Sequence, residues 1–341
     1  MKKIIMMLLV LCTVFAVSSC GEKTETAKKV AAEQKTEQKA GSEKEILPEP
    51  FYEKMQTNTR PFGVMIDNDD NNARPQRGLE SAYLVYEMVV EGKATRFFAL
   101  FKDITEMEKI GPIRSSRHYF LDYALENDAV YVHAGWSDRA AIEITSRNVN
   151  NINGLYEDSA FYRDNTYDNT WHNLYLNPQK VSDVANNKGY RRETDVKGLS
   201  YHKNHVTPDG EKAEKLSIPY VDFYEVEFKY NQETKVYDRY VNGKPHMSQT
   251  DEGLTAKNIL VYYVQDVPLN DGIYAPRRDL QNLGSGEGYY LSEGVATPIT
   301  WEKQTHDGKT IYKTKDGADL VVNPGNTYIQ LVPTYIEYTL N

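Results

Sequence analysis

The stretch AYLVYEMVVEGKATRFFALF, residues 82–101, decides the fold of this chain. It contains two apolar runs, which the polar tripeptide Glu91-Gly92-Lys93 separates. Runs of this length that are rich in β-branched and aromatic residues indicate buried strands, and a short connection that contains glycine favours a hairpin. A third run of the same kind, Phe62-Gly63-Val64-Met65-Ile66, lies upstream. The sequence therefore predicts that these segments are adjacent strands of one sheet.

After these strands the pattern changes to helices that alternate with short strands. Gly111-Pro112 breaks the chain, and the apolar residues between Phe120 and Leu125 then recur with the spacing of one helix face. The Asn-rich and Tyr-rich segment 148–177 has no clean period, and we expect loops there. The other predicted elements of this half are a strand at 129–132 and helices at 138–145 and 178–187.

Beyond about Gly210 the sequence becomes alternating and rich in turns, which is typical of β structure. Asn242-Gly243 is a strong hairpin signal at the end of one of these runs. The predicted strands are 226–230, 236–241, 259–264, 288–291, 299–301, 309–314 and 328–332. We therefore expect an α+β protein, with a mixed α/β N-terminal domain over residues 51–205 and a smaller, mostly β C-terminal domain over residues 206–341.

The first residues carry an export signal. Lys2-Lys3 precede an apolar run, and the small residues Ser18-Ser19 stand directly before Cys20. This order is typical of a lipoprotein signal peptide, residues 1–19, whose removal leaves a lipidated Cys20 at the start of the mature chain. A transmembrane anchor is the alternative, but the run is shorter than the roughly 20 residues that span a bilayer. We expect an extracytoplasmic protein that is anchored to the bacterial membrane by lipid at Cys20.

Residues 20–50 mix Glu with Lys and contain almost no large apolar side chains, so they predict a disordered tether. The chain has a formal net charge of −9, and an acidic protein does not attract nucleic acid by its overall field. Only two cysteines occur, Cys12 in the signal segment and Cys20 at the anchor. The folded part therefore has no thiol, which excludes disulfides, cysteine nucleophiles and thiolate metal sites.

The segment Ile110-Gly111-Pro112-Ile113-Arg114-Ser115-Ser116-Arg117 is the strongest candidate for a binding site. A helix start offers unpaired backbone N–H groups and a partial positive charge, and here Arg114, Ser115 and Arg117 flank it. Arginine adds bidentate geometry that suits phosphate or carboxylate. We infer an anion site. The alternative is that both arginines pair with internal carboxylates.

Other charged residues lie at or near the ends of the predicted strands. Arg74 and Arg96 add positive charge, and Asp67, Glu87 and Glu91 add carboxylates. If the sheet brings these ends together, one cleft could hold a phosphorylated or carboxylated ligand, with or without a divalent cation. The same residues could equally form a structural ion-pair network without a ligand.

Motifs of the common hydrolases and metalloenzymes are missing from this sequence. It has no G-x-S-x-G, no H-E-x-x-H and no Walker loop, so it establishes no cofactor and no set of metal ligands, and a bound divalent cation stays open as an alternative. His202-x-x-His205 has plausible ligand spacing, but it lies in a polar loop that contains lysine. His133, at the end of a predicted strand, is the candidate for proton transfer if a reaction occurs.

The sequence resembles the YerB-like lipoproteins, a bacterial family built on a two-part domain of unknown function. The resemblance implies an α/β first domain and a β-rich second domain on an exported lipoprotein, and it implies no activity. The segments that carry it include Met65-Ile66-Asp67-Asn68, Ala73-Arg74-Pro75-Gln76, Tyr86-Glu87, Thr95-Arg96-Phe97, Ile110 to Ser115, Val132-His133-Ala134-Gly135, His172-Asn173-Leu174-Tyr175 and Asn323-Pro324-Gly325.

Two hypotheses about function follow from these residues. In the first, the N-terminal domain binds or processes an anionic glycan or a phosphorylated envelope ligand, which Arg74, Arg96, Arg114 and Arg117 would hold. In the second, the protein is a non-catalytic lipoprotein whose Tyr-rich surface binds another protein, and the charged residues are internal ion pairs. Guanidinium groups that converge on an open cleft would favour the first hypothesis, and one-to-one pairs with carboxylates would favour the second.

Overall fold

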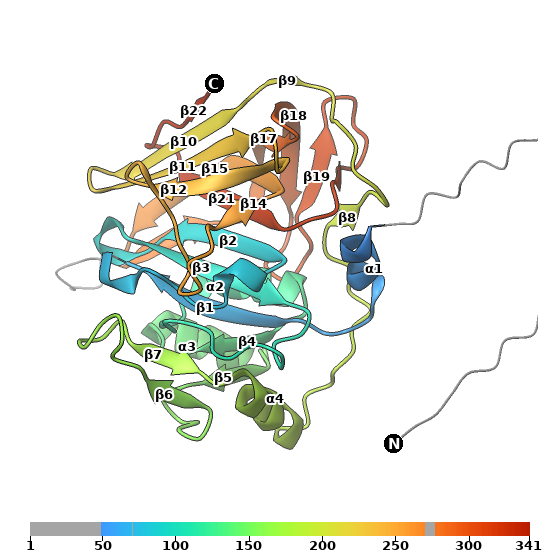
Figure 1. The fold of residues 1–341 in the computed structure, drawn as a ribbon. Coiled ribbons are helices and arrows are strands. Elements are labelled where there is room, and N and C mark those ends of the chain that lie inside the picture. The colour runs from blue at the N-terminus through green and yellow to red at the C-terminus, as the bar shows by residue number, and fades with distance from the viewer. Residues whose placement is uncertain (1–48, 70, 270–276) are drawn as a thin grey trace, which may run out of the picture. The chain divides into compact units, whose positions relative to one another are not determined.

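The computed structural model describes residues 49–69, 71–269 and 277–341 (Figure 1). The predicted signal peptide, Cys20 and nearly all of the tether lie outside these residues. Residues Leu47–Asn341 group into one unit by their internal contacts. The helices of the described part are α1 (Pro50–Gln56), α2 (His118–Glu126), α3 (Asp138–Ser146) and α4 (Pro178–Asn187), besides short 3-10 turns at Asn71–Ala73, Leu79–Ser81 and Glu91–Lys93. None of the described helices has the length and apolar character needed to cross a bilayer.

Within the described residues a mixed sheet of twelve strands runs through both halves of the chain. Its order is β19 (Ile311–Thr314), β18 (Val295–Lys303), β17 (Gly284–Ser292), β15 (Asn258–Pro268), β21 (Thr327–Pro333), β2 (Leu84–Val89), β3 (Thr95–Phe101), β1 (Phe62–Asn68), β4 (Val130–His133) and β5 (Asn151–Asn153). In addition, β16 (Arg278–Gln281) pairs with β15, and β9 (Glu211–Lys212) pairs with β18. This sheet is the main support of the molecule.

A second sheet of six described strands packs near β1–β3 (Figure 1). Its order is β13 (Lys244–Pro245), β12 (Val236–Val241), β11 (Tyr224–Asn231), β10 (Lys215–Val221) and β22 (Thr339–Leu340), and β14 (Thr255–Ala256) pairs with β12. Two short pairs complete the described strands, β20 (Val321–Val322) with β8 (Ser200–Tyr201) and β6 (Phe161–Arg163) with β7 (Leu174–Leu176).

Strands β1, β2 and β3 are buried along their whole length because both faces of the sheet are covered. On β3, Phe98 packs toward α2 through Tyr86, whose ring lies 4.4 Å from the ring of Tyr123. The preceding residue, Phe97, points to the opposite side and faces the second sheet, where the guanidinium carbon of Arg239 lies 5.2 Å from the Phe97 ring. We call these the helix face and the sheet face. Because side chains alternate along a strand, this assignment fixes the face of every neighbouring residue.

The predicted α+β fold is confirmed. The structure has a mixed α/β sheet with helices in the N-terminal part and a mostly antiparallel sheet in the C-terminal part. Strands β2 and β3 form the predicted antiparallel pair, with Val89 opposite Thr95. Gly92 in their connection has φ of 66°, a left-handed conformation that favours glycine.

Two features go beyond the predicted pattern. Segment 148–177, which was expected to form loops, contains the short strands β5, β6 and β7. Strands from both sides of the expected boundary between residues 205 and 206 share the large sheet, because β2 pairs in parallel with β21. The division into domains at that position stays a prediction.

A buried ion pair links α2 to β18, far apart in the sequence. The Lys303 ammonium lies 2.7 Å from Glu126 Oε2, and both side chains are almost fully buried. The Thr310 hydroxyl donates to the same oxygen at 2.7 Å, and the Tyr86 hydroxyl donates to Oε1 at 2.7 Å. The carboxylate is therefore fully hydrogen-bonded, which a buried charge requires.

We predict that Lys303→Met lowers the free energy of unfolding by about 3 to 5 kcal/mol, because it leaves the Glu126 carboxylate buried without its cation. Urea denaturation followed by circular dichroism measures this loss. The exposed Lys309 serves as the matched control, and Lys309→Met should change stability by less than about 0.5 kcal/mol. Equal stability of the two variants would show that the pair does not hold the two halves together.

Candidate functional site

The residues predicted for one site lie on two opposite faces of the large sheet. Asp67 is directly opposite Arg96 across β1 and β3, and both belong to the helix face. Asn68 is opposite Thr95, and Glu87 is opposite Phe97, so these residues belong to the sheet face. The structure therefore does not bring Glu87 together with Asp67 and Arg96, although all three were assigned to one cleft.

On the sheet face, Glu87 is the centre of a buried polar network. Arg239 of β12 donates to Glu87 Oε2 at 2.9 Å, and both side chains are fully buried. The Tyr224 hydroxyl donates to Oε1 at 2.6 Å, and the Thr95 hydroxyl donates to the same oxygen at 2.9 Å. These bonds satisfy both oxygens of the carboxylate and connect the two sheets.

Arg74 and His246 belong to the same network. Arg74 donates to the side-chain oxygen of Asn68 at 2.7 Å, and its guanidinium carbon lies 5.2 Å from the ring of Tyr224. Burial and the positive charges of Arg239 and Arg74 hold the pKa of His246 well below its usual value. The ring is therefore neutral, so Nδ1 accepts from Arg239 and Nε2 donates to Gln76 Oε1 at 2.7 Å. These contacts engage Arg74 within the fold, and its part in anion binding stays a prediction.

On the helix face, Asp67 is held by two cationic or donor groups. The Arg114 Nε atom and the His172 Nδ1 atom each lie 2.7 Å from Asp67 Oδ2, and the carboxylate is fully buried. Burial alone would raise the pKa of Asp67, but the hydrogen bond from His172 and the positive charges of Arg114 and Arg96 lower the pKa below its usual value. Asp67 is therefore an anion at neutral pH and neutralises Arg114.

Arg117 and Glu91 form a second pair on this face. Arg117 precedes α2 and donates through Nε and through a terminal nitrogen to the two oxygens of Glu91, the latter at 2.9 Å. Burial would raise the pKa of Glu91, and these hydrogen bonds and the charge of Arg117 lower it. This bidentate geometry is the strongest form of such a pair. The positive charge of Arg117 is thus matched, like that of Arg114.

Arg96 differs from the other arginines. Its side chain is 5% exposed and donates to the backbone carbonyl of Ser115 at 2.7 Å. Among the described residues no carboxylate forms an ion pair with it, and its Nε atom has no hydrogen-bond partner. Burial and the nearby charge of Arg117 lower the pKa of Arg96 to about 10. Within the part of the chain that the structure describes, Arg96 is therefore a buried cation without an ion-paired carboxylate, although the charges of Asp67 and Glu91 partly offset the lowering of its pKa.

His133, the candidate for proton transfer, is fully buried at the end of β4. Its Nδ1 atom lies 2.8 Å from the Gly135 carbonyl oxygen, and its Nε2 atom lies 3.2 Å from the side-chain oxygen of Asn151. Burial lowers the pKa of His133. Both ring nitrogens are engaged within the protein, so the arrangement gives this role no support, and it stays a prediction.

Two residues of the helix-face site had no predicted role. His172 contacts Asp67 across 105 residues of sequence, and Trp171 stacks on Arg114, with the guanidinium carbon 4.4 Å from the ring. More than half of the surface of three large side chains is exposed here: 57% for Trp171, 59% for Leu155 and 70% for Tyr156. Leu155 lies beside Gly135 and Ser115, so these apolar side chains border the arginines. Two signals in the sequence pointed to this region, the family resemblance at His172-Asn173-Leu174-Tyr175 and the aromatic residues of the polar, Asn-rich segment 148–177.

The described residues contain no group of three or more His, Cys, Asp or Glu side chains arranged to hold a metal ion. The Asp67 carboxylate is directed to Arg114 and His172. His205, from the motif His202-x-x-His205, lies 3.8 Å from a carboxylate oxygen of Glu49 and 3.9 Å from one of Glu293.

The electrostatics of Asp67 predict the pH dependence of stability. Because the folded pKa of Asp67 is below the unfolded value of about 3.9, its stabilising effect is present above that pH and is lost as the pH falls through the folded pKa. The difference in unfolding free energy between wild type and Asp67→Asn should therefore shrink as the pH falls below about 4. Urea titrations between about pH 7 and about pH 3, followed by Trp fluorescence, measure it.

Asp69 provides a control of opposite sign. Burial and the charge of Asp67 raise the pKa of Asp69, so its folded form takes up protons more readily than the unfolded chain. Relative to Asp69→Asn, wild type should gain stability as the pH falls. The same trend for both variants would contradict the assigned charges.

Comparison with known proteins identifies the family. Residues 49–191 match the model of the "Protein of unknown function (DUF3048) N-terminal domain", and residues 216–329 match that of the C-terminal domain. The chain is 30% identical over 338 residues to "Putative lipoprotein YerB" of Bacillus subtilis (strain 168), which covers 95% of this chain and 93% of that protein. The crystal structure of the YerB protein from Bacillus subtilis superposes with a TM-score of 0.74 at 27% identity, over 86% of this chain and 100% of that chain. The predicted resemblance is confirmed: this chain belongs to the DUF3048 family and is a homologue of YerB.

Proposed function

We propose that the protein is a lipid-anchored, extracytoplasmic binding protein that holds an anionic group of an envelope glycan on its helix face. The observation that carries this proposal is Arg96, a buried cation that forms no ion pair with a carboxylate of the described residues, although the charges of Asp67 and Glu91 act on it. Cys20 would attach the protein to the bacterial membrane, and the segment after it would let the folded part reach its ligand.

The charge balance around Arg96 supports an anion as the ligand. Arg114 pairs with Asp67 and also lies 3.8 Å from Asp69, and Arg117 pairs with Glu91, whereas Arg96 forms no ion pair with a described carboxylate. Arg114 and Arg117 expose 15% and 13% of their side chains, which gives an anion access to donors beside Arg96. Guanidinium groups bind phosphate and carboxylate oxygens with bidentate geometry. An anion at this position would offset the mutual repulsion of the three arginines.

The aromatic border supports a glycan as the carrier of that anion. Trp171 and Tyr156 are more than half exposed, Trp171 stacks on Arg114, and Trp136 contacts both His133 and Tyr156. Large aromatic rings with an apolar face and a polar edge suit the apolar faces of sugar rings. A glycan that carries phosphate or carboxylate offers an anion to the arginines and a sugar ring to the aromatic side chains. This role is binding alone and requires no reaction.

A protein partner is the second candidate. The pairs Arg114–Asp67 and Arg117–Glu91 favour it, because matched charges stabilise a fold without any ligand. Exposed Leu155, Tyr156 and Trp171 would then be the apolar centre of a docking surface, where aromatic residues are enriched.

Titration of the full chain with N-acetylglucosamine 1-phosphate and with galacturonate, by isothermal calorimetry, tests the proposal. We expect that Arg117→Gln and Trp171→Ala each weaken binding by about tenfold or more, which corresponds to about 1.4 kcal/mol. Arg191→Gln is the matched control, because Arg191 is exposed and pairs with Asp128 on another part of the surface.

Both test variants change partly exposed side chains, so circular dichroism should show a native fold. Equal affinities in wild type and the two variants, or no heat up to about 10 mM of either probe, would reject the glycan proposal. That result would favour the protein partner.

A further inference from the structure

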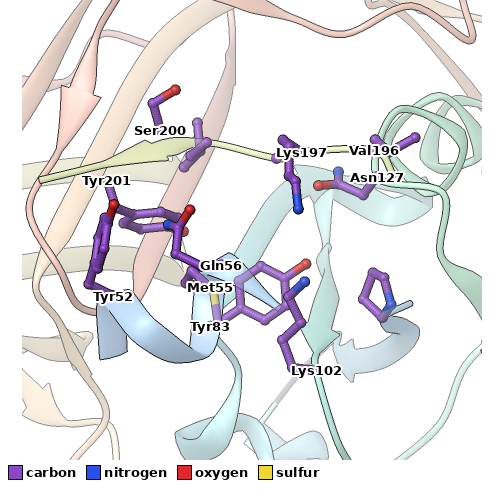
Figure 2. Close-up of a pocket in the computed structure, with 13 residues that line it drawn as sticks. Tyr52, Met55, Gln56, Tyr83, Lys102, Asn127, Val196, Lys197, Ser200 and Tyr201 are labelled. Atoms are coloured by element: carbon purple, nitrogen blue, oxygen red, sulfur yellow. The ribbon is translucent and has the colours of Figure 1, made fainter. Parts of the chain in front are cut away.

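A pocket of about 260 Å³ lies away from the helix-face arginines, beside α1 (Figure 2). Its walls come from α1, from the strand ends that carry Tyr83 and Lys102, and from the segment 196–201. None of the residues that the sequence suggested for a site lines this pocket. Figure 2 shows Lys102 and Lys197 directed into it from two different walls.

The lining of this pocket contains two lysines and no acidic residue. The Lys102 ammonium donates to the backbone carbonyls of Thr57 at 3.2 Å and Thr59 at 3.1 Å. The Lys197 ammonium donates to the side-chain oxygen of Asn58 at 2.8 Å. All these acceptors are neutral, and no carboxylate of the described residues forms an ion pair with either lysine. An ammonium group has three donors, so one on Lys102 and two on Lys197 remain for another acceptor.

The two positive charges act on each other. Burial and the charge of Lys197 lower the pKa of Lys102, and no carboxylate contributes to its shift. Lys197 is exposed, and its positive charge disfavours the charged form of the half-buried Lys102 unless an anion lies nearby. An oxyanion between the lysines would remove this repulsion and use the remaining donors.

The other walls define the shape of what could bind. Met55, Tyr83 and Leu199 give an apolar surface, and Tyr83 directs its hydroxyl into the pocket beside Lys102 (Figure 2). A bare inorganic ion would leave this apolar surface without a partner. The wall is about as polar as it is apolar, which suits a small molecule that carries both a charged group and an apolar body.

We propose that this pocket binds a small organic oxyanion, a carboxylate or a phosphate monoester on a short apolar body, between the ammonium groups of Lys102 and Lys197. The site is separate from the glycan surface proposed above and does not depend on it. The lysines also hold the loop at residues 57–59, and ligand binding would tighten the same contacts.

The test uses the full chain in detergent, titrated by calorimetry with benzoate, phenyl phosphate and inorganic phosphate. We expect phenyl phosphate or benzoate to bind more tightly than inorganic phosphate, because only these probes cover the apolar wall. Lys197→Gln should weaken that binding by about tenfold or more, and Lys197→Arg should retain most of it. Lys54→Gln is the matched control, since Lys54 lies on α1 but is exposed outside the pocket.

Two further experiments test whether the oxyanion comes from a lipid headgroup and whether the probes bind in this pocket or beside the helix-face arginines. Vesicles with and without phosphatidylglycerol, compared by flotation of the chain that lacks lipid at Cys20, show whether a lipid headgroup supplies the oxyanion. Arg117→Gln should leave benzoate and phenyl phosphate binding unchanged. The inference is overturned if Lys197→Gln binds these probes as wild type does, if Arg117→Gln abolishes their binding instead, or if wild type binds none of the three up to about 10 mM.

Discussion

The burial of the Glu87 carboxylate is the constraint on which the arrangement of the two sheets depends. A carboxylate removed from water is strongly destabilising unless cations and donors surround it. Here these groups come from β3, β11 and β12, so the second sheet must lie on β2 and β3 in one position to satisfy them. We infer that this network selects the packing of the two sheets more than it adds net stability, since apolar residues could fill the same volume.

The local elements could be predicted from the sequence, because period and turn chemistry are local properties. The β2–β3 hairpin and helices α2, α3 and α4 follow this rule. The composition of the site could not be predicted in the same way. The sequence does not show that Asp67 and Glu87 lie on opposite faces of the sheet, because the face of a residue depends on the register of its strand. Their main contacts are also distant in sequence, since Asp67 and His172 are 105 residues apart and Glu87 and Arg239 are 152 residues apart.

The arginines and the lysines illustrate a general difficulty in finding sites from sequence. Arginine-rich motifs attract attention, yet Arg114, Arg117 and Arg239 each have a carboxylate partner in the fold. Lys102 and Lys197 stand in unremarkable sequence, and the acceptors that the described residues offer them are neutral. Whether a charge is matched is a property of the tertiary structure, so residue type alone identifies candidates but does not rank them.

The parallel pairing of β2 with β21 has a consequence for biogenesis. Leu84 pairs with Thr327, so the inner strand β2 keeps an open, apolar edge until nearly the whole polypeptide has emerged. An exposed edge of this kind is a template for aggregation. If the chain passes through an export channel from its N-terminus, the β2–β3 hairpin emerges before β21, the strand that covers the open edge of β2. The sheet is thus completed late, and a holding chaperone on the far side of the membrane would protect the chain during that interval.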